Sequence, residues 1–188
     1  MEPIDFKCEM CGECCKHTHY EITIGGQPLL VGLQIQLDET DFLRSRGMVL
    51  LPQIGGGMKG DKRFRPKKVY TYQMVTDSCP LMSANKICSI HLSRPRVCRA
   101  YPIQDQAIPD PRCTFLKRHI ASTDSEGTAI FSVPIRFAEQ LEAHDAVYEK
   151  YESVGLHGAF PLWIFDLKTR KWYVLSQSDM LECLTKNV

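Results

Sequence analysis

The chain has 188 residues, of which 44% are hydrophobic and 24% charged, so it can bury the core of an ordinary soluble domain. Its formal net charge of +1 argues against an overall attraction to nucleic acid or to an acidic membrane surface. No apolar run approaches the roughly 18 residues of a membrane span, and residues 1–7 lack the pattern of a signal peptide. We therefore expect a cytoplasmic protein with no nucleic-acid and no membrane partner.

A strand, a mixed segment and a short helix are predicted after the first cysteines. Tyr20-Glu21-Ile22-Thr23-Ile24 alternates and carries β-branched residues, which is typical of a strand, and Gly25-Gly26 would end it. Residues 29–37 are apolar and predict a strand or a mixed segment. Residues 38–47 begin with acidic residues and end with basic residues and a glycine, which favours a short helix because this order complements the helix dipole.

A glycine run divides the middle of the chain. Gly55-Gly56-Gly57 predicts the start of a mobile loop, which continues through a basic run from Lys59 to Lys68. This run could bind an acidic partner or a nucleic-acid backbone, but we interpret it as a solvated loop because the chain is nearly neutral. The alternation of residues 69–75 then predicts a strand that leads to Cys79.

The stretch from Cys79 to Cys113 is interrupted by prolines at positions 80, 95, 102, 109 and 111. Proline removes a backbone donor and breaks regular elements. We therefore expect loops and short helical turns here, shaped more by a metal than by regular backbone hydrogen bonds.

The last third predicts a helix followed by a hairpin. Residues at helical spacing between Pro134 and Gly155 indicate one amphipathic helix, and they are Phe137, Leu141, His144, Tyr148 and Tyr151. Two apolar runs, residues 162–167 and 172–175, flank the polar residues 168–171 and predict a β-hairpin. Ser178 is a candidate cap for a short final helix.

Eight of the nine cysteines fall into two segments: Cys8, Cys11, Cys14 and Cys15, then Cys79, Cys88, Cys98 and Cys113. A reducing cytosol disfavours stable disulfides, so thiols clustered in this way indicate a metal site. Cysteines separated by two residues can turn both sulfurs toward one ion, and Gly12 permits the tight bend between them. We therefore predict these eight cysteines as metal ligands. Cys183 lies far from them and is interpreted as a small buried apolar residue.

The adjacent pair Cys14-Cys15 bears on the number of metals. Neighbouring side chains diverge, so either one thiol is spare or the two serve different ions, in two four-sulfur sites or one linked centre. All-sulfur ligation suits zinc, iron and an iron–sulfur cluster alike. The first three cysteines have ferredoxin spacing, but no fourth cysteine follows at the ferredoxin interval, which excludes a ferredoxin.

Three histidines lie near the cysteines in sequence, at His17, His19 and His91. Each could replace a thiol as a ligand, but with eight sulfurs available we interpret them as supporting or surface residues.

Several functions are compatible with this pattern. A structural zinc site without reactivity fits eight thiols, whereas thiol redox chemistry needs only two or three. An iron–sulfur enzyme fits as well, and so does a chaperone that delivers iron or zinc; a protein partner is compatible with each. The sequence contains no nucleophile elbow, phosphate-binding glycine loop or dinucleotide fingerprint. It therefore predicts metal binding without assigning catalytic residues.

The cysteine segments resemble the YkgJ-like cysteine-cluster family, the CxxCxxCC zinc- or iron-chelating domain. Residues 6–15 are similar to its opening signature, and Cys79-Pro80-Leu81 to a second element. Cys88-Ser89-Ile90-His91 matches a third element, with His91 in place of the usual tyrosine. Residues 94–102, Arg-Pro-Arg-Val-Cys-Arg-Ala-Tyr-Pro, match a fourth. The resemblance covers Cys8 to Cys113.

This resemblance implies a bacterial or archaeal cytosolic protein that carries a metal ion or cluster. One related branch is the flagellin lysine N-methylase, so an iron–sulfur-dependent protein-lysine N-methylase-like enzyme is the alternative function, although this chain lacks the additional length expected of that enzyme. Arg94, Arg99 and Tyr101 of the fourth element could offset thiolate charge or form ordinary salt bridges.

The predicted fold is α+β. We expect a cysteine-rich, metal-stabilised domain of short helices and strands over residues 1–120. Residues 121–188 would add the helix, the hairpin and a short helix, packed on the same domain.

Overall fold

The computed structural model describes residues 2–16, 18–24, 27–59, 63–103, 109–125, 128–153 and 161–176. It has short helices and several small sheets, which confirms the predicted α+β class. No helix within these ranges is long and apolar enough to cross a membrane.

The chain forms two compact units that are interleaved in sequence. Unit 1 comprises Met1–His17 and Cys79–Val147, and unit 2 comprises Thr18–Ser78 and Tyr148–Val188. Each unit is therefore built from two separate segments. The expected division into residues 1–120 and 121–188 stays a prediction.

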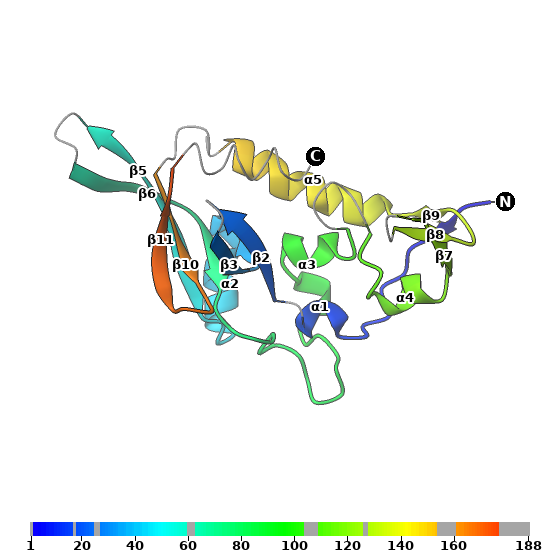
Figure 1. The fold of residues 1–188 in the computed structure, drawn as a ribbon. Helices are drawn as coiled ribbons and strands as arrows, with labels where there is room; N and C mark the ends of the chain where they lie inside the picture. Colours follow the sequence, from blue (N-terminus) through cyan, green and yellow to red (C-terminus); the bar gives the residue numbers. More distant parts are fainter. Residues whose placement is uncertain are drawn as a thin grey trace. The chain divides into compact units, whose positions relative to one another are not determined.

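Unit 2 is organised around a five-stranded sheet with the strand order β11-β10-β5-β6-β4 (Figure 1). Its strands are β4 (Gln34–Ile35), β5 (Leu50–Lys59), β6 (Arg63–Met74), β10 (Leu162–Asp166) and β11 (Lys171–Leu175). The central strands β5 and β6 are antiparallel, and β10 pairs antiparallel with both β5 and β11. The predicted strand over residues 69–75 and the predicted C-terminal hairpin are both confirmed.

A second hairpin and a short helix complete unit 2. β2 (His19–Ile24) confirms the first predicted strand and pairs with β3 (Gln27–Gly32). The apolar segment 29–37 is mixed, because it contains the end of β3, then β4, then the start of η1 (Leu37–Glu39). α2 (Thr40–Ser45) confirms the short helix predicted within residues 38–47.

The mobile loop predicted at Gly55-Gly56-Gly57 is wrong. β5 continues through these glycines, and Gly56 and Gly57 pair with Pro66 and Arg65 of β6. Register shifts at Gln53/Ile54 and Gly55/Gly56 show that the glycines accompany irregularities in a long hairpin. Backbone pairing needs no side chain, so composition alone could not distinguish this strand from a loop. Figure 1 shows the hairpin extending past β10 and β11.

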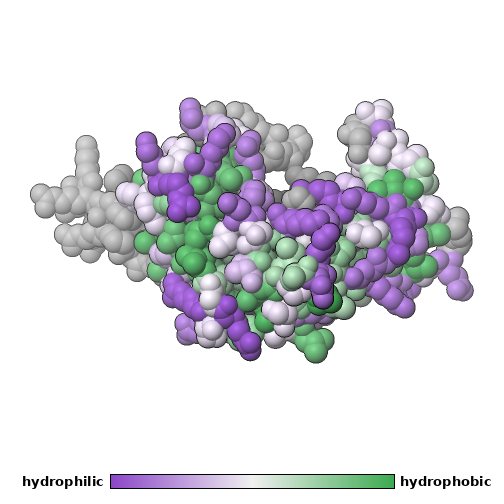
Figure 2. Space-filling model, turned by 90° about the horizontal axis from the view of Figure 1, so that it is seen from below, coloured by the Kyte–Doolittle hydropathy of each residue, from purple (hydrophilic) through white to green (hydrophobic). Residues whose placement is uncertain are grey.

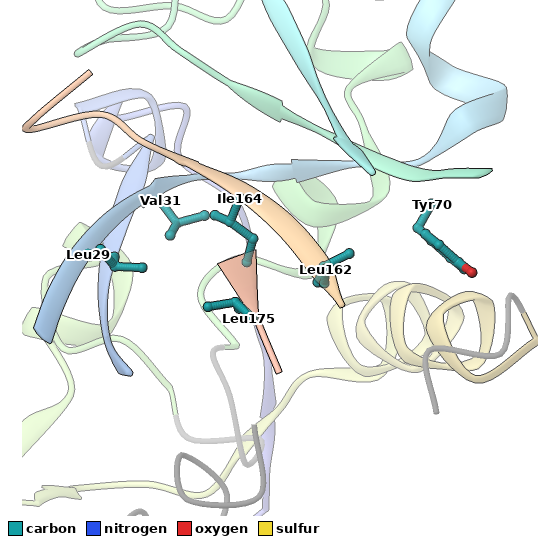
Figure 3. Close-up of a cluster of buried hydrophobic side chains, with 6 residues drawn as sticks. All are labelled: Leu29, Val31, Tyr70, Leu162, Ile164 and Leu175. Atoms are coloured by element: carbon teal, nitrogen blue, oxygen red, sulfur yellow. The ribbon is translucent and has the colours of Figure 1, made fainter. Parts of the chain in front are cut away.

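The core of unit 2 lies where β3 meets the C-terminal hairpin. The buried cluster consists of Leu29, Val31, Tyr70, Leu162, Ile164 and Leu175 (Figure 3). Figure 3 shows Val31 of β3 beside Ile164 of β10. Alternate residues of β10 are buried, which is the period expected of a strand with one face in the core. This unit therefore has an apolar core that contains none of the eight candidate cysteines.

Asp166 fixes the turn of the C-terminal hairpin. Its carboxylate is 1% exposed and accepts hydrogen bonds from the amides of Leu30 (2.8 Å) and Thr169 (2.8 Å). Burial raises the pKa of Asp166, but hydrogen bonds from the Thr169 side chain and from the surrounding amides outweigh burial and lower this pKa overall. The buried carboxylate thus holds the turn in place of the Asn-Gly pair found in tighter hairpins.

Within unit 1, the described part of the Cys79–Cys113 stretch has only one short α-helix and one 3-10 turn, as its prolines predicted. The helical elements of unit 1 are α1 (Glu13–Lys16), η2 (His91–Ser93), α3 (Arg96–Ala100), α4 (Thr114–Lys117) and α5 (Ala138–Ser153), the last of which belongs to this unit up to Val147. Its strands are β1 (Ile4–Asp5), which pairs with β9 (Ile135–Arg136), and β7 (Ile120–Thr123), which pairs with β8 (Ala129–Phe131). Cys113, Phe115 and Leu116 form its buried cluster, with Phe6 and Phe137 packed against it.

The predicted helix between Pro134 and Gly155 is confirmed as α5, but its buried face is partly wrong. Among the side chains described here, Gln140, Ala143 and Val147 are buried, whereas Leu141 of the predicted face is 39% exposed. The side chains of Tyr148 and Tyr151 are not described. Glutamine and alanine carry little hydrophobic signal. The sequence pattern was therefore wrong at Leu141, while Phe137 of the predicted face packs against the buried cluster of unit 1.

On the face drawn in Figure 2, hydrophobic and hydrophilic side chains are interspersed. Scattered exposed apolar residues are ordinary for a folded protein. Three predictions lie outside what the structure describes: the end of the first strand at Gly25-Gly26, the helix capped by Ser178, and the burial of Cys183. The side chains of the basic run are not described either.

Candidate metal centre

The first cysteine segment makes a tight bend and then one turn of helix. Cys8 and Cys11 precede α1, and Cys14 and Cys15 lie within it. Gly12 has a φ of +77°, and its carbonyl accepts a hydrogen bond from the Cys15 amide at 3.0 Å. A Cβ on Gly12 would lie 3.0 Å from the carbonyl oxygen of Lys86. Glycine is therefore required both by the backbone conformation and by the close approach of the 82–86 loop.

The second segment carries its cysteines on loops and short helices. The amide of Cys79 donates a hydrogen bond to the carbonyl of Cys15 at 2.9 Å, which joins the two cysteine segments. Cys88 forms an isolated antiparallel bridge with Met82, whose amide donates to the carbonyl of Cys79 at 3.2 Å. Cys98 lies in α3, and Cys113 directly precedes α4. All eight candidate cysteines therefore lie in unit 1, and none forms a disulfide.

Three thiols at the junction of the two segments are joined by hydrogen bonds. Cys15 is buried and shares hydrogen bonds with both Cys14 and Cys79. The bond with Cys15, assisted by the amides of Leu81 and Met82, outweighs burial and lowers the pKa of Cys79 to about 6. The bond with Cys15 also lowers the pKa of Cys14, while the pKa of Cys15 itself is raised. The thiolate form is thus favoured at Cys79 and Cys14 and disfavoured at Cys15.

Cys88 and Cys98 belong to the same neighbourhood. Burial raises the pKa of both thiols, and the charges of Cys14 and Cys79 raise it further. Cys88 and Cys98 therefore favour the neutral thiol when no cation is bound. A bound cation would reverse the effect, because thiolates are the form that ligates metal.

Cys8 has different neighbours. Its sulfur is exposed and lies 3.4 Å from His91 Nε2, and it accepts a hydrogen bond from Arg94 Nη1 at 3.3 Å. Arg94 is only 9% exposed, and its charge also lowers the pKa of Cys14. Burial, then the charge of Arg94, lowers the pKa of His91 and favours the neutral imidazole. The predicted placement of an arginine beside the thiols is therefore observed for Arg94.

No hydrogen bond joins Arg99 or Tyr101 to a sulfur among the described residues, although the charges of Cys113, Cys14 and Cys11 act on Tyr101. Arg99 Nε and the Tyr101 hydroxyl are buried and lack a hydrogen-bond partner within the described ranges. Burial raises the pKa of Tyr101. Glu139, which the sequence did not single out, lies 3.9 Å from Arg94 and is largely exposed. No signal in the sequence connects a residue of α5 with the cysteine motif.

The donor set suits zinc or iron in its chemistry, since sulfur and imidazole are ligands that these metals prefer. Within the described part of the chain, however, no three His, Cys, Asp or Glu side chains already converge as a metal ion requires. The thiols would have to turn toward one another on loading. His19 lies in β2 of unit 2, and His17 lies outside the described residues.

A family model for the CxxCxxCC family, described as a putative zinc- or iron-chelating domain, matches residues 7–114. The chain belongs to the CxxCxxCC family. The matched range spans both cysteine segments, which confirms the resemblance predicted from the motifs. No curated protein and no solved structure matches the chain. CxxCxxCC membership therefore supplies a metal-chelating character and no particular activity.

Proposed function

We propose that the chain binds zinc or an iron or iron–sulfur centre in unit 1, with the eight cysteines as ligands: Cys8, Cys11, Cys14, Cys15, Cys79, Cys88, Cys98 and Cys113. The observation that carries this proposal is the junction of the two segments. The hydrogen bond from the Cys79 amide to the Cys15 carbonyl and the Cys14–Cys15–Cys79 thiol contacts bring together cysteines from distant parts of the sequence. Family membership supports the same interpretation.

The polypeptide around the thiols also supports a stabilising role for the metal. The stretch from Cys79 to Cys113 has a single α-helix, α3, and one 3-10 turn among its described residues. Such a segment gains little from regular hydrogen bonds, whereas structural zinc can contribute ~10–16 kcal/mol to a small domain. A cytoplasmic location would keep the thiols reduced for this purpose.

Metal delivery is a second candidate, favoured by one feature. The Cys8 sulfur is exposed while Cys15 and Cys113 are buried, so a ligand exchanging with another protein could reach Cys8 first. An iron–sulfur enzyme of the lysine N-methylase type is the alternative with a catalytic role, and binding of a methyl donor to the purified protein would test it directly.

The deciding experiment is anaerobic purification of the full chain with elemental analysis and an absorbance spectrum. Colourless protein with zinc supports a zinc centre, and brown protein with iron and labile sulfide supports a cluster. Cys79→Ser should lower the metal content, while Ser78→Ala, an exposed neighbour, should retain it. Metal-free protein under both zinc- and iron-replete conditions would refute the proposal. If a chelator removes the metal without unfolding the chain, delivery is favoured over a structural role.

A further inference from the structure

His91 and Cys8 lie in contact although they are 83 positions apart in the chain. The distance from His91 Nε2 to Cys8 Sγ is 3.4 Å. A zinc ion about 2.3 Å from a sulfur and about 2.0–2.1 Å from a nitrogen, at the tetrahedral angle, holds those two atoms about 3.5–3.6 Å apart. The pair therefore already has nearly the separation of two ligands on one ion.

Packing within unit 1 holds both members of this pair in place. Phe6, two residues before Cys8, packs edge-on against Phe115 of the buried cluster, with ring centroids 5.1 Å apart. His91 begins η2 directly after Ile90, which is buried. The contact between imidazole and thiol is thus fixed by the fold on each side.

His91 also follows Cys88 at a spacing that is common for pairs of zinc ligands. Two residues separate them, as two separate Cys8 and Cys11, and the His91 amide donates a hydrogen bond to the Cys88 carbonyl at 3.3 Å. The turn faces solvent, because Leu92, next in the chain, is 98% exposed, and Cys8 is exposed as well. An ion can therefore reach the pair from outside unit 1.

We propose that His91 is a ligand of the metal centre and binds the same ion as Cys8. This inference rests on the proposed metal-binding function, to which it adds a nitrogen donor that the eight cysteines do not supply. Thiolate and imidazole together are an established donor set for zinc. Within the described ranges no three donors already converge, so the other ligands of this ion must move toward the pair on loading.

Arg94 is compatible with this assignment. Its Nη1 donates a hydrogen bond to Cys8 Sγ at 3.3 Å, and a sulfur that ligates a metal can still accept such a bond. The guanidinium would then orient the thiolate while His91 approaches the ion from its other side.

The test is X-ray absorption on the reduced full chain, loaded anaerobically with zinc or, if only iron is retained, with iron. For zinc, the wild type should show a nitrogen ligand at about 2.0–2.1 Å beside sulfur at about 2.3 Å, and His91→Gln should lack the nitrogen. Glutamine can still form a hydrogen bond with Cys8, so this variant separates ligation from hydrogen bonding.

Two further variants separate ligation from folding. His91→Cys should restore metal binding through sulfur alone, since thiolate also ligates zinc. His119→Gln is the matched control, because His119 packs against Phe115 in the same unit and makes no hydrogen bond to a described sulfur, and it should keep the nitrogen signal.

Metal affinity, measured by competition with a chelator, tests whether the two residues hold one ion. His91→Gln and Cys8→Ser should each weaken binding by more than the roughly 10–100-fold typical of losing an outer-shell partner. In the double variant the two losses should fall well short of adding, because both residues hold the same ion. Additive losses, a wild-type spectrum with sulfur only, or a nitrogen signal unchanged in His91→Gln would overturn the assignment and leave the proposed function standing. If the wild type binds neither zinc nor iron, both proposals fail.

Discussion

Arg94 Nη1 donates a hydrogen bond to Cys8 Sγ over 3.3 Å, and its guanidinium is buried. A buried cation that contacts one thiol and acts electrostatically on Cys14, Cys88 and Cys98 makes the cluster more tolerant of negative charge. The arginine of the fourth sequence element therefore contacts the sulfur of Cys8 directly.

Replacing Arg94 should therefore weaken metal binding. For Arg94→Gln we expect a loss of about 10–100-fold in affinity, measured by competition with a chelator, because the anionic sulfurs lose their compensating charge. Arg136→Gln is the control, since Arg136 is exposed and pairs with exposed Asp5 in the same unit. Equal affinity in both variants would show that Arg94 only closes the loop.

Removal of the metal should affect the two units differently. Unit 2 has a five-stranded sheet over its apolar core, whereas the described part of the Cys79–Cys113 stretch has no strand of a sheet and only short helical elements. Hydrogen–deuterium exchange of chelated protein should show lost protection between Cys79 and Cys113, with β10 and β11 keeping theirs. Simultaneous loss in both places would contradict a local role for the metal.

The buried carboxylate of Asp166 should make a pH-dependent contribution to the free energy of unfolding. Asp166→Asn should cost about 1–3 kcal/mol near neutral pH, because buried amides lose a charged acceptor. The pKa of Asp166 is lower in the folded chain than in the unfolded chain, where it is about 3.9. The stabilisation by the carboxylate is therefore complete above this unfolded-state pKa, and it is lost as the pH falls through the folded-state pKa. Urea titrations should show a constant difference from wild type at pH 5–7 that narrows below about pH 4. Asp77→Asn, an exposed control, should show no such difference.

Gly32, at the end of β3, tests how closely the backbone approaches β6. A Cβ at this position would lie 1.7 Å from the carbonyl oxygen of Met74, and backbone cannot move aside cheaply. Gly32→Ala should cost at least ~3 kcal/mol in denaturant unfolding. Gly47→Ala should cost only about 1 kcal/mol, because Gly47 has a φ of +84° but no atom within 4 Å of the added Cβ. Equal effects would mean that β3 and β6 can separate without penalty.

The sequence predicted those elements whose signal is local. The strand at residues 20–24, the helix within 38–47 and the C-terminal hairpin are each indicated by periodicity or terminal charge, and each is present. The long hairpin through Gly55-Gly56-Gly57 was missed because its stability comes from pairing with a partner strand, which composition does not reveal. The pairing of β10 with β5 is likewise set by tertiary structure.

The sequence identified the candidate thiols but not the contacts that they make. Spacing identified eight thiols, and the structure places all of them in unit 1. The link from Cys15 to Cys79 and the contact of His91 with Cys8 depend on how loops fold back. Loop closure of this kind leaves no periodic signal, so only the three-dimensional structure could reveal it.

The interleaving of the two units bears on when the centre can be assembled. Residues 18–78 separate the first four cysteines from the rest of unit 1. A ribosome adds about 5–20 residues per second, so Cys8–Cys15 emerge seconds before Cys113 does. During that interval the early thiols are open to oxidation and to the wrong ion. If both segments ligate the metal as proposed, the centre can be completed only late in biosynthesis, and over-expression in a metal-poor or aerated culture should yield chains whose first segment has already reacted.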